Sequence, residues 1–102
     1  MNRQIDRHRS EIEALCRRYR VRRLDLCGSA ATGGDRPQES DFDFLVEFEA
    51  LPPGAYADGY FGLLEDLERL LARPVDLVVA TAIKNPYFRQ SVEATKVPLY
   101  AA

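Results

Sequence analysis

The sequence predicts a small mixed α/β (α+β) domain, in which helices pack on a sheet. In two long segments, apolar residues recur at three- and four-residue steps, the spacing of amphipathic helices. Elsewhere, short runs alternate apolar and polar residues, as half-buried strands do. The chain has 102 residues, 46% hydrophobic and 29% charged. We therefore expect one domain, residues 1–102, around a single core.

The first half of the chain predicts a helix, a strand, a loop and a second strand. A helix over roughly residues 3–19 is marked by its apolar positions: Ile5, His8, Ile12, Leu15, Cys16 and Tyr19. Residues 21–28 change to a period of two and end at Gly28, which predicts a strand. Residues 29–40 are rich in glycine and small polar residues, and predict a loop. Residues 42–48, "FDFLVEF", form the clearest strand, with Asp41, Asp43 and Leu45 on one face.

The second half repeats this alternation of helices and strands. Residues 51–59 are expected to form a connecting segment without regular structure. A second long helix is expected from Tyr60 to Leu71, ending before Pro74. Residues 75–80, "VDLVVA", predict a third strand. Asn85 and Pro86 give the cap and first-turn signature of a helix over roughly residues 86–95. The closing "VPLYA" predicts a short edge strand, where a proline is tolerated.

Charge and composition exclude several classes of function. The net charge of −2 does not favour binding to the negatively charged backbone of a nucleic acid, so we expect no direct nucleic-acid binding. Arginines are concentrated in residues 1–23, where we expect a solvated face. An RNA- or partner-binding surface is the alternative, which the lack of interleaved aromatic residues disfavours. No apolar run is long enough for a membrane span or a signal peptide.

Cysteine, histidine and lysine usage points to an ordinary cytoplasmic protein. Cys16 and Cys27 lack metal-ligand spacing and sit among apolar residues, so we expect reduced core thiols in the cytoplasm. His8 is expected at the boundary of the core rather than as a general base. Lys84 and Lys96 are expected to be solvated.

The carboxylates of two strands are the candidate site. Asp41 and Asp43 lie side by side on one strand face, and Asp76 occupies a position where its neighbours predict Val or Ile. If the two strands are adjacent, the three carboxylates converge. Hard oxygen ligands without Cys or His suit Mg²⁺ or Mn²⁺ rather than zinc. A pair of such ions can support an in-line displacement at phosphorus.

The turn at Gly28 and Ser29 adds a second feature to this site. Free backbone N–H groups and a hydroxyl at such a turn can cradle a phosphate chain. Each feature alone has a structural explanation: a Gly-Ser pair is usually a turn, Asp43 could face solvent, and Asp76 could pair with an arginine of the first helix. Their combination favours phosphoryl or nucleotidyl transfer.

The pattern "GS…SDFDFLV…VDLV" resembles the minimal nucleotidyltransferase (MNT) domains of the DNA polymerase beta-like superfamily. The resemblance spans nearly the whole chain and implies that superfamily's palm-like fold. It implies that Asp41, Asp43 and Asp76 hold two Mg²⁺ ions, with Mn²⁺ as a substitute, and that Asp76 activates the incoming hydroxyl. It implies that Gly28 and Ser29 hold the β- and γ-phosphates of ATP. Thr32 stands where the family often has arginine, and Arg36 is expected to supply that charge.

The resemblance also implies a biological role. Such short proteins resemble antitoxins that transfer AMP from ATP to a tyrosine of a partner HEPN ribonuclease toxin, within a homo- or hetero-oligomer. Two alternatives stay open. The chain could be a non-catalytic antitoxin that inhibits its toxin by occlusion, or a small-molecule nucleotidyltransferase similar to the aminoglycoside-modifying enzymes. We expect no additional acceptor-binding domain, which disfavours the latter unless a homodimer builds the pocket.

Overall fold

The computed structural model describes residues 3–28 and 42–102, which form a mixed four-stranded sheet. Strand β1 pairs antiparallel with both β2 and β4, and β2 pairs parallel with β3, so the order across the sheet is β3-β2-β1-β4. The strand bounds are Val21–Cys27 for β1, Phe42–Phe48 for β2, Val75–Val79 for β3 and Val97–Ala101 for β4. The predicted α/β class and the edge position of the last strand are confirmed.

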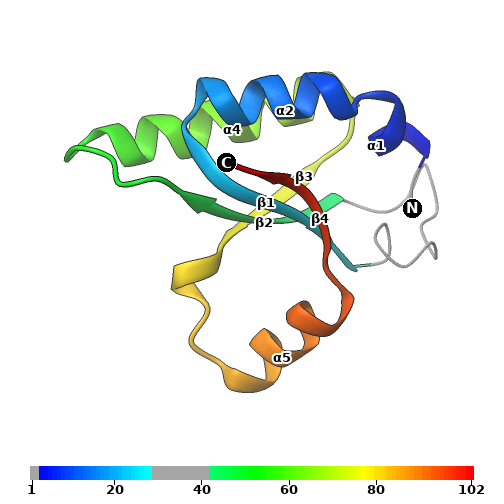
Figure 1. Ribbon diagram of the computed structural model, residues 1–102, viewed down its shortest axis with the longest axis vertical. Helices are drawn as coiled ribbons and strands as arrows, with labels where there is room; N and C mark the ends of the chain where they lie inside the picture. Colours follow the sequence, from blue (N-terminus) through cyan, green and yellow to red (C-terminus); the bar gives the residue numbers. More distant parts are fainter. Residues whose placement is uncertain (1–2, 29–41) are drawn as a thin grey trace.

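Helices cover both faces of this sheet, but unequally. Figure 1 shows α2 and α4 lying together on one face and α5 on the other. The helical bounds are Arg3–Arg7 for α1, Arg9–Arg18 for α2, Ala55–Leu71 for α4, Ala80–Ala82 for the 3-10 turn η1 and Pro86–Thr95 for α5. None of the described helices combines the length and apolarity that crossing a bilayer requires.

The main core lies between the sheet and the α2–α4 layer. The even-numbered residues of β2, from Phe42 to Phe48, all face this layer, as the period of two predicts. Helix α4 contributes Leu63, Leu67 and Leu71, which are fully buried. Cys16 lies in the same core as a free thiol, as expected. This face supplies most of the apolar burial that stabilises the fold.

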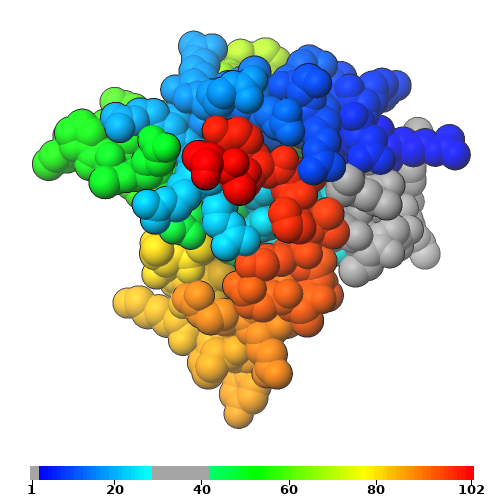
Figure 2. Space-filling view, viewed as in Figure 1, coloured from blue at the N-terminus to red at the C-terminus, as the bar shows by residue number. Residues whose placement is uncertain are grey.

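The opposite face carries only a small cluster. Cys27, Leu45 and Ile83 are buried there, and Val78 and Val92 pack against them. Helix α5 has no buried residue along its whole length. It therefore covers this face loosely, and Figure 2 shows its segment, in orange, projecting from the body of the molecule.

The first helix is interrupted where the sequence predicts continuity. His8 separates α1 from α2, is half-buried, and places its Nδ1 3.0 Å from Glu11 Oε1. In α1, Ile5 is fully buried and the Gln4 amide donates to the carbonyl of Leu71, the last residue of α4. The change of direction at His8 places Gln4 next to the end of α4. The hydrogen bond from Gln4 gives a partner to a carbonyl in the last turn of α4, where no N–H of the same helix is available.

Helix α4 begins five residues before its predicted start, at Ala55 rather than Tyr60. Two prolines and a glycine predict a connector there. The first turn is held by packing instead: the Tyr56 ring meets Phe48 edge-on, with ring centroids 5.3 Å apart. Gly59 is buried against Phe48 and Leu51. Tertiary contacts thus outweigh the low helix propensity of glycine.

A buried carboxylate on β1 is a feature that the sequence analysis missed. Asp25 is 3% exposed, and its Oδ2 lies 3.9 Å from Lys96 Nζ and 3.8 Å from Arg23 Nη2. Its Oδ1 has no hydrogen-bond partner among the described residues. Lys96, expected to be solvated, is largely buried here and also pairs with Glu93 at 2.7 Å, whereas Lys84 is exposed as expected. The pair joins the end of α5 to the sheet.

We expect Asp25→Asn to stabilise the protein at neutral pH. Burial raises the pKa of Asp25, only partly opposed by Lys96 and Arg23, so folding costs more once this carboxyl is ionised. The cost is absent below the ordinary carboxyl pKa and grows as the pH rises through the raised value. The gain should be on the order of 1 kcal/mol at pH 7 and vanish near pH 3. Urea unfolding at several pH values measures it, and a gain independent of pH would contradict the assignment.

Candidate active site

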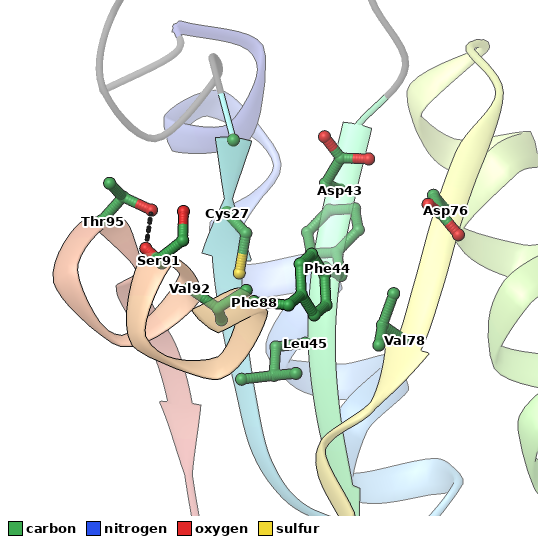
Figure 3. Close-up of a pocket in the computed structure, with 11 residues that line it drawn as sticks. Cys27, Asp43, Phe44, Leu45, Asp76, Val78, Phe88, Ser91, Val92 and Thr95 are labelled. Carbon is green, nitrogen blue, oxygen red and sulfur yellow. Dashed lines mark hydrogen bonds between the residues drawn. The ribbon is translucent and has the colours of Figure 1, made fainter. Parts of the chain in front are cut away.

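Asp43 and Asp76 lie opposite each other on adjacent strands. The parallel register pairs Asp43 with Asp76 directly, and each is the second residue of its strand. Neighbouring strands are about 4.8 Å apart, and paired residues point to the same face. Figure 3 shows both carboxylates at the same end of β2 and β3. The predicted convergence is therefore confirmed for these two residues.

Strand β1 ends beside the two carboxylates, and Gly28 is the residue that follows it. It follows Cys27, the β1 residue that pairs with Asp43. Its φ of +69° is in the left-handed region that favours glycine. A Cβ at this position would lie 2.5 Å from Asp43 Oδ2, well inside van der Waals contact. The bare Cα of Gly28 therefore leaves room for the Asp43 carboxylate.

Three residues of the predicted site, Ser29, Arg36 and Asp41, lie outside the described residues, as does Thr32. Asp41 immediately precedes Phe42, the first residue of β2. Within the described ranges, no group of three Asp, Glu, His or Cys side chains could hold a metal ion. Asp43 and Asp76 form a pair of hard oxygen donors, and Mg²⁺ commonly takes one or two carboxylates together with substrate phosphates. The donor chemistry thus fits Mg²⁺ or Mn²⁺.

The alternative explanation of Asp76, an ion pair with the first helix, is wrong. Asp76 is exposed and lies on the face that α5 covers, whereas α2 packs on the opposite face. Two α2 arginines contact other acids: Arg9 Nε lies 4.0 Å from Glu13 Oε2, and Arg18 Nη1 lies 3.9 Å from Asp66 Oδ2. These exposed contacts fit the solvated arginine face that the sequence predicts.

A cavity of about 230 Å³ opens beside the two carboxylates. Figure 3 shows its arrangement, with α5 standing over the sheet. The sheet side is formed by Cys27, Leu45 and Val78, and the α5 side by Phe88, Ser91, Val92 and Thr95. Gly28, Asp43 and Asp76 also line it, so the cavity and the carboxylates form one site.

Cys27 is a neutral thiol within this site. Burial, followed by the negative charges of Asp25 and Asp43, raises the pKa of Cys27 to about 11. A thiolate is the reactive form of cysteine, and at pH 7 this thiol stays protonated. Cys27 therefore contributes apolar packing surface rather than a nucleophile.

The residues of α5 were not among the predicted site residues. Phe88 and Val92 are four residues apart, as are Ser91 and Thr95. Residues at this spacing share a helix face, so the sequence does contain a signal for one cavity-lining surface. The spacing alone cannot say that this surface faces Asp43 and Asp76, because that depends on where α5 docks.

Comparisons with known proteins agree with this geometry. A family model described as nucleotidyltransferase domain matches residues 9–98. A Methanocaldococcus jannaschii protein, provisionally named a protein adenylyltransferase, is 36% identical over 82% of this chain and 90% of its own length. A solved structure, provisionally described as a minimal nucleotidyltransferase, has a TM-score of 0.79 at 31% identity and covers 96% of both chains.

Two solved complexes share the fold at lower identity. One is a toxin–antitoxin complex with AMP-PNP, with a TM-score of 0.71 at 22% identity, covering 92% of this chain and 73% of that one. The other is a tri-AMPylated Shewanella oneidensis HEPN toxin bound to its MNT antitoxin. Its TM-score is 0.65 at 19% identity, covering 95% of this chain and 72% of that one.

Gly28→Ala should move the Asp43 carboxylate, and Gly54→Ala is its matched control. Both glycines have positive φ, so each substitution should cost about 1–2 kcal/mol in unfolding free energy. A Cβ at Gly54 meets nothing within 4 Å, whereas one at Gly28 meets Asp43. The NMR chemical shift of the Asp43 carboxyl carbon should change only in Gly28→Ala. An unchanged Asp43 signal there would show that the two groups are not in contact.

Proposed function

The chain belongs to the nucleotidyltransferase domain family, and on that premise we propose that it transfers AMP from ATP to a hydroxyl of a partner protein. The observation that carries the proposal is the pairing of Asp43 with Asp76 on adjacent parallel strands, with Gly28 at the same edge. We take residues 1–102 as one minimal nucleotidyltransferase domain. Two free cysteines and an ATP substrate suit the cytoplasmic location that the sequence predicts.

Asp43 and Asp76, with Asp41 from the start of β2, would hold two Mg²⁺ ions, or Mn²⁺ in their place. When bound, such ions supply positive charge to the phosphate oxygens and lower the pKa of a bound hydroxyl. The two described carboxylates differ in surroundings. Asp43 is half-buried beside Gly28, whereas Asp76 is exposed and can be reached by an incoming hydroxyl. Asp76 is accordingly the residue that accepts the proton of that hydroxyl.

Gly28, Ser29 and Arg36 would hold the β- and γ-phosphates of ATP. Gly28 has no side chain to obstruct a close approach, and its left-handed conformation redirects the chain at the end of β1. Backbone N–H groups that follow such a residue can point together at an anion. Arg36 would supply the charge that Thr32 does not.

The acceptor is proposed to be a tyrosine of a HEPN ribonuclease toxin, which this chain would neutralise as its antitoxin. The support comes from two comparisons: the M. jannaschii relative is named for protein adenylylation, and the Shewanella complex contains an AMPylated HEPN toxin beside its MNT antitoxin. The experiment below distinguishes this role from the two alternatives, which are inhibition of the toxin by occlusion and transfer to a small molecule.

Co-expression with the partner toxin should produce toxin carrying one or more adenylyl groups, detected by intact-mass analysis. Asp43→Asn combined with Asp76→Asn should reduce this transfer at least about 100-fold, because several kcal/mol of charge stabilisation depend on these ligands. Glu65→Gln is the control, since Glu65 is an exposed carboxylate of α4 on the other side of the sheet.

Two results would overturn the enzyme proposal in different ways. If the double variant neutralises an unmodified toxin as well as the parent does, inhibition is by occlusion. If the toxin is never modified but an aminoglycoside is, the small-molecule alternative holds.

Mg²⁺ or Mn²⁺ should raise the melting temperature in the presence of ATP. Ligands that bind only the folded state stabilise it, by about 2.7 kcal/mol at a concentration of 100 Kd. Asp43→Asn should remove most of this response while leaving the metal-free protein at least as stable, because one of two repelling charges is gone. Differential scanning fluorimetry measures both effects. A melting temperature insensitive to both metals with ATP present would contradict the metal site.

A further inference from the structure

The cavity under α5 has a size and a lining that suit one aromatic ring. Its volume is about 230 Å³, below the roughly 300–1,000 Å³ of pockets that enclose a drug-sized ligand. A whole nucleotide does not fit inside it. The sheet side is apolar, built from Leu45, Val78 and the neutral Cys27, and Phe88 and Val92 face them from α5.

This lining favours a phenol ring over an adenine base. Adenine carries ring nitrogens and an amino group around its edge, and each polar group buried without a partner costs about 1–3 kcal/mol. Among the described lining residues, the hydroxyls are those of Ser91 and Thr95, and Thr95 Oγ1 already donates to the Ser91 carbonyl at 3.1 Å. A phenol has a single polar atom, which can point out of the apolar part toward the carboxylates.

The distance from the cavity to the carboxylates matches the length of such a side chain. Leu45 follows Asp43 by two residues and Val78 follows Asp76 by two, on the same face of the sheet. Two residues of strand span roughly 6.6 Å, close to the length of a tyrosine side chain beyond its Cα. A tyrosine side chain that enters over Leu45 and Val78 therefore lays its ring between these residues and the carboxylates, with its hydroxyl beside Asp43 and Asp76.

We propose that this cavity is the acceptor pocket, which holds the ring of the tyrosine that receives AMP. The inference rests on the proposed function. The tyrosine oxygen attacks the α-phosphorus of ATP, the bond from that phosphorus to the bridging oxygen of the β-phosphate breaks, and pyrophosphate leaves. The phenol proton passes to the Asp76 carboxylate and then to solvent. Phe88, 48% exposed, forms one side of the entrance, and the loosely packed α5 leaves it open to a partner's side chain.

The binding test uses p-cresol, which is the tyrosine side chain without its backbone, and requires no toxin. NMR titration of the metal-free protein should shift the methyl signals of Leu45, Val78 and Val92, with the Leu63 and Leu67 signals of the main core unchanged. Adenosine at equal concentration should leave all of them in place. Val92→Phe should abolish the p-cresol shifts by filling the cavity, and unchanged Leu63 and Leu67 signals would verify its fold.

The kinetic test uses the full toxin as acceptor and compares two neighbouring aromatic residues. Phe88→Ala, which removes a cavity wall, should raise KM for the toxin at least about tenfold and change KM for ATP less than twofold. Tyr87→Ala is the matched control, because Tyr87 is 81% exposed on the same helix and is not among the residues lining the cavity. It should leave both constants within about twofold.

The outcomes separate this inference from the function on which it rests. Adenosine shifts at these methyls, or a raised KM for ATP in Phe88→Ala, would make the cavity a base pocket and overturn the inference. Absence of any p-cresol shift would overturn it as well. An equal rise in KM for the toxin in Phe88→Ala and Tyr87→Ala would also overturn it, because α5 would then act only as a docking surface for the toxin. Failure of the unaltered protein to modify any toxin would instead refute the proposed function.

Discussion

The parallel pairing of β2 with β3 is the constraint on which the site depends. Parallel strands begin at the same edge of a sheet, so a carboxylate near the start of each is brought to its neighbour. The register matters as much as the direction. A slip of one residue would set Asp43 opposite Leu77, whose side chain points into the core, and the two acids would lie on opposite faces. The apolar residues of both strands lock this register, because their burial between the sheet and α4 would be lost with it.

The two faces of the sheet have different roles: one carries the main apolar core, and the other carries the candidate site. One face is covered by α2 and α4 over a continuous apolar core, and it supplies the burial that can offset repulsion between Asp43 and Asp76. The other face holds a small cluster, the buried Asp25 and an open cavity. Close packing throughout would leave no place for a substrate. A loosely held α5 is therefore consistent with a face that binds ligands, since functional segments are drawn from the less stable parts of a fold.

Transfer to a protein hydroxyl rather than to water needs an acceptor held in place. Positioning of two reactants can contribute several kcal/mol to lowering a reaction barrier, which is how a bound phenol outcompetes solvent. The described residues offer a largely apolar cavity beside the carboxylates, and it is lined by α5 as much as by the sheet. The Asp25–Lys96 contact ties the end of that helix to β1, so this buried ion pair helps to set the shape of the proposed acceptor pocket.

The sequence by itself determined the features that depend on local periodicity. Alternation over "FDFLVEF" and "VDLVV" was enough to place Asp43 and Asp76 on the face opposite the core, because side chains alternate along any strand. Tertiary structure decided what covers each face. Alternation puts Asp25 outward just as it does Asp43, yet Asp25 is buried because Lys96 comes to it from the end of α5 and Arg23 from its own strand. The early start of α4 and the docking of α5 were likewise fixed by contacts between different elements, which the periodicity of one segment does not record.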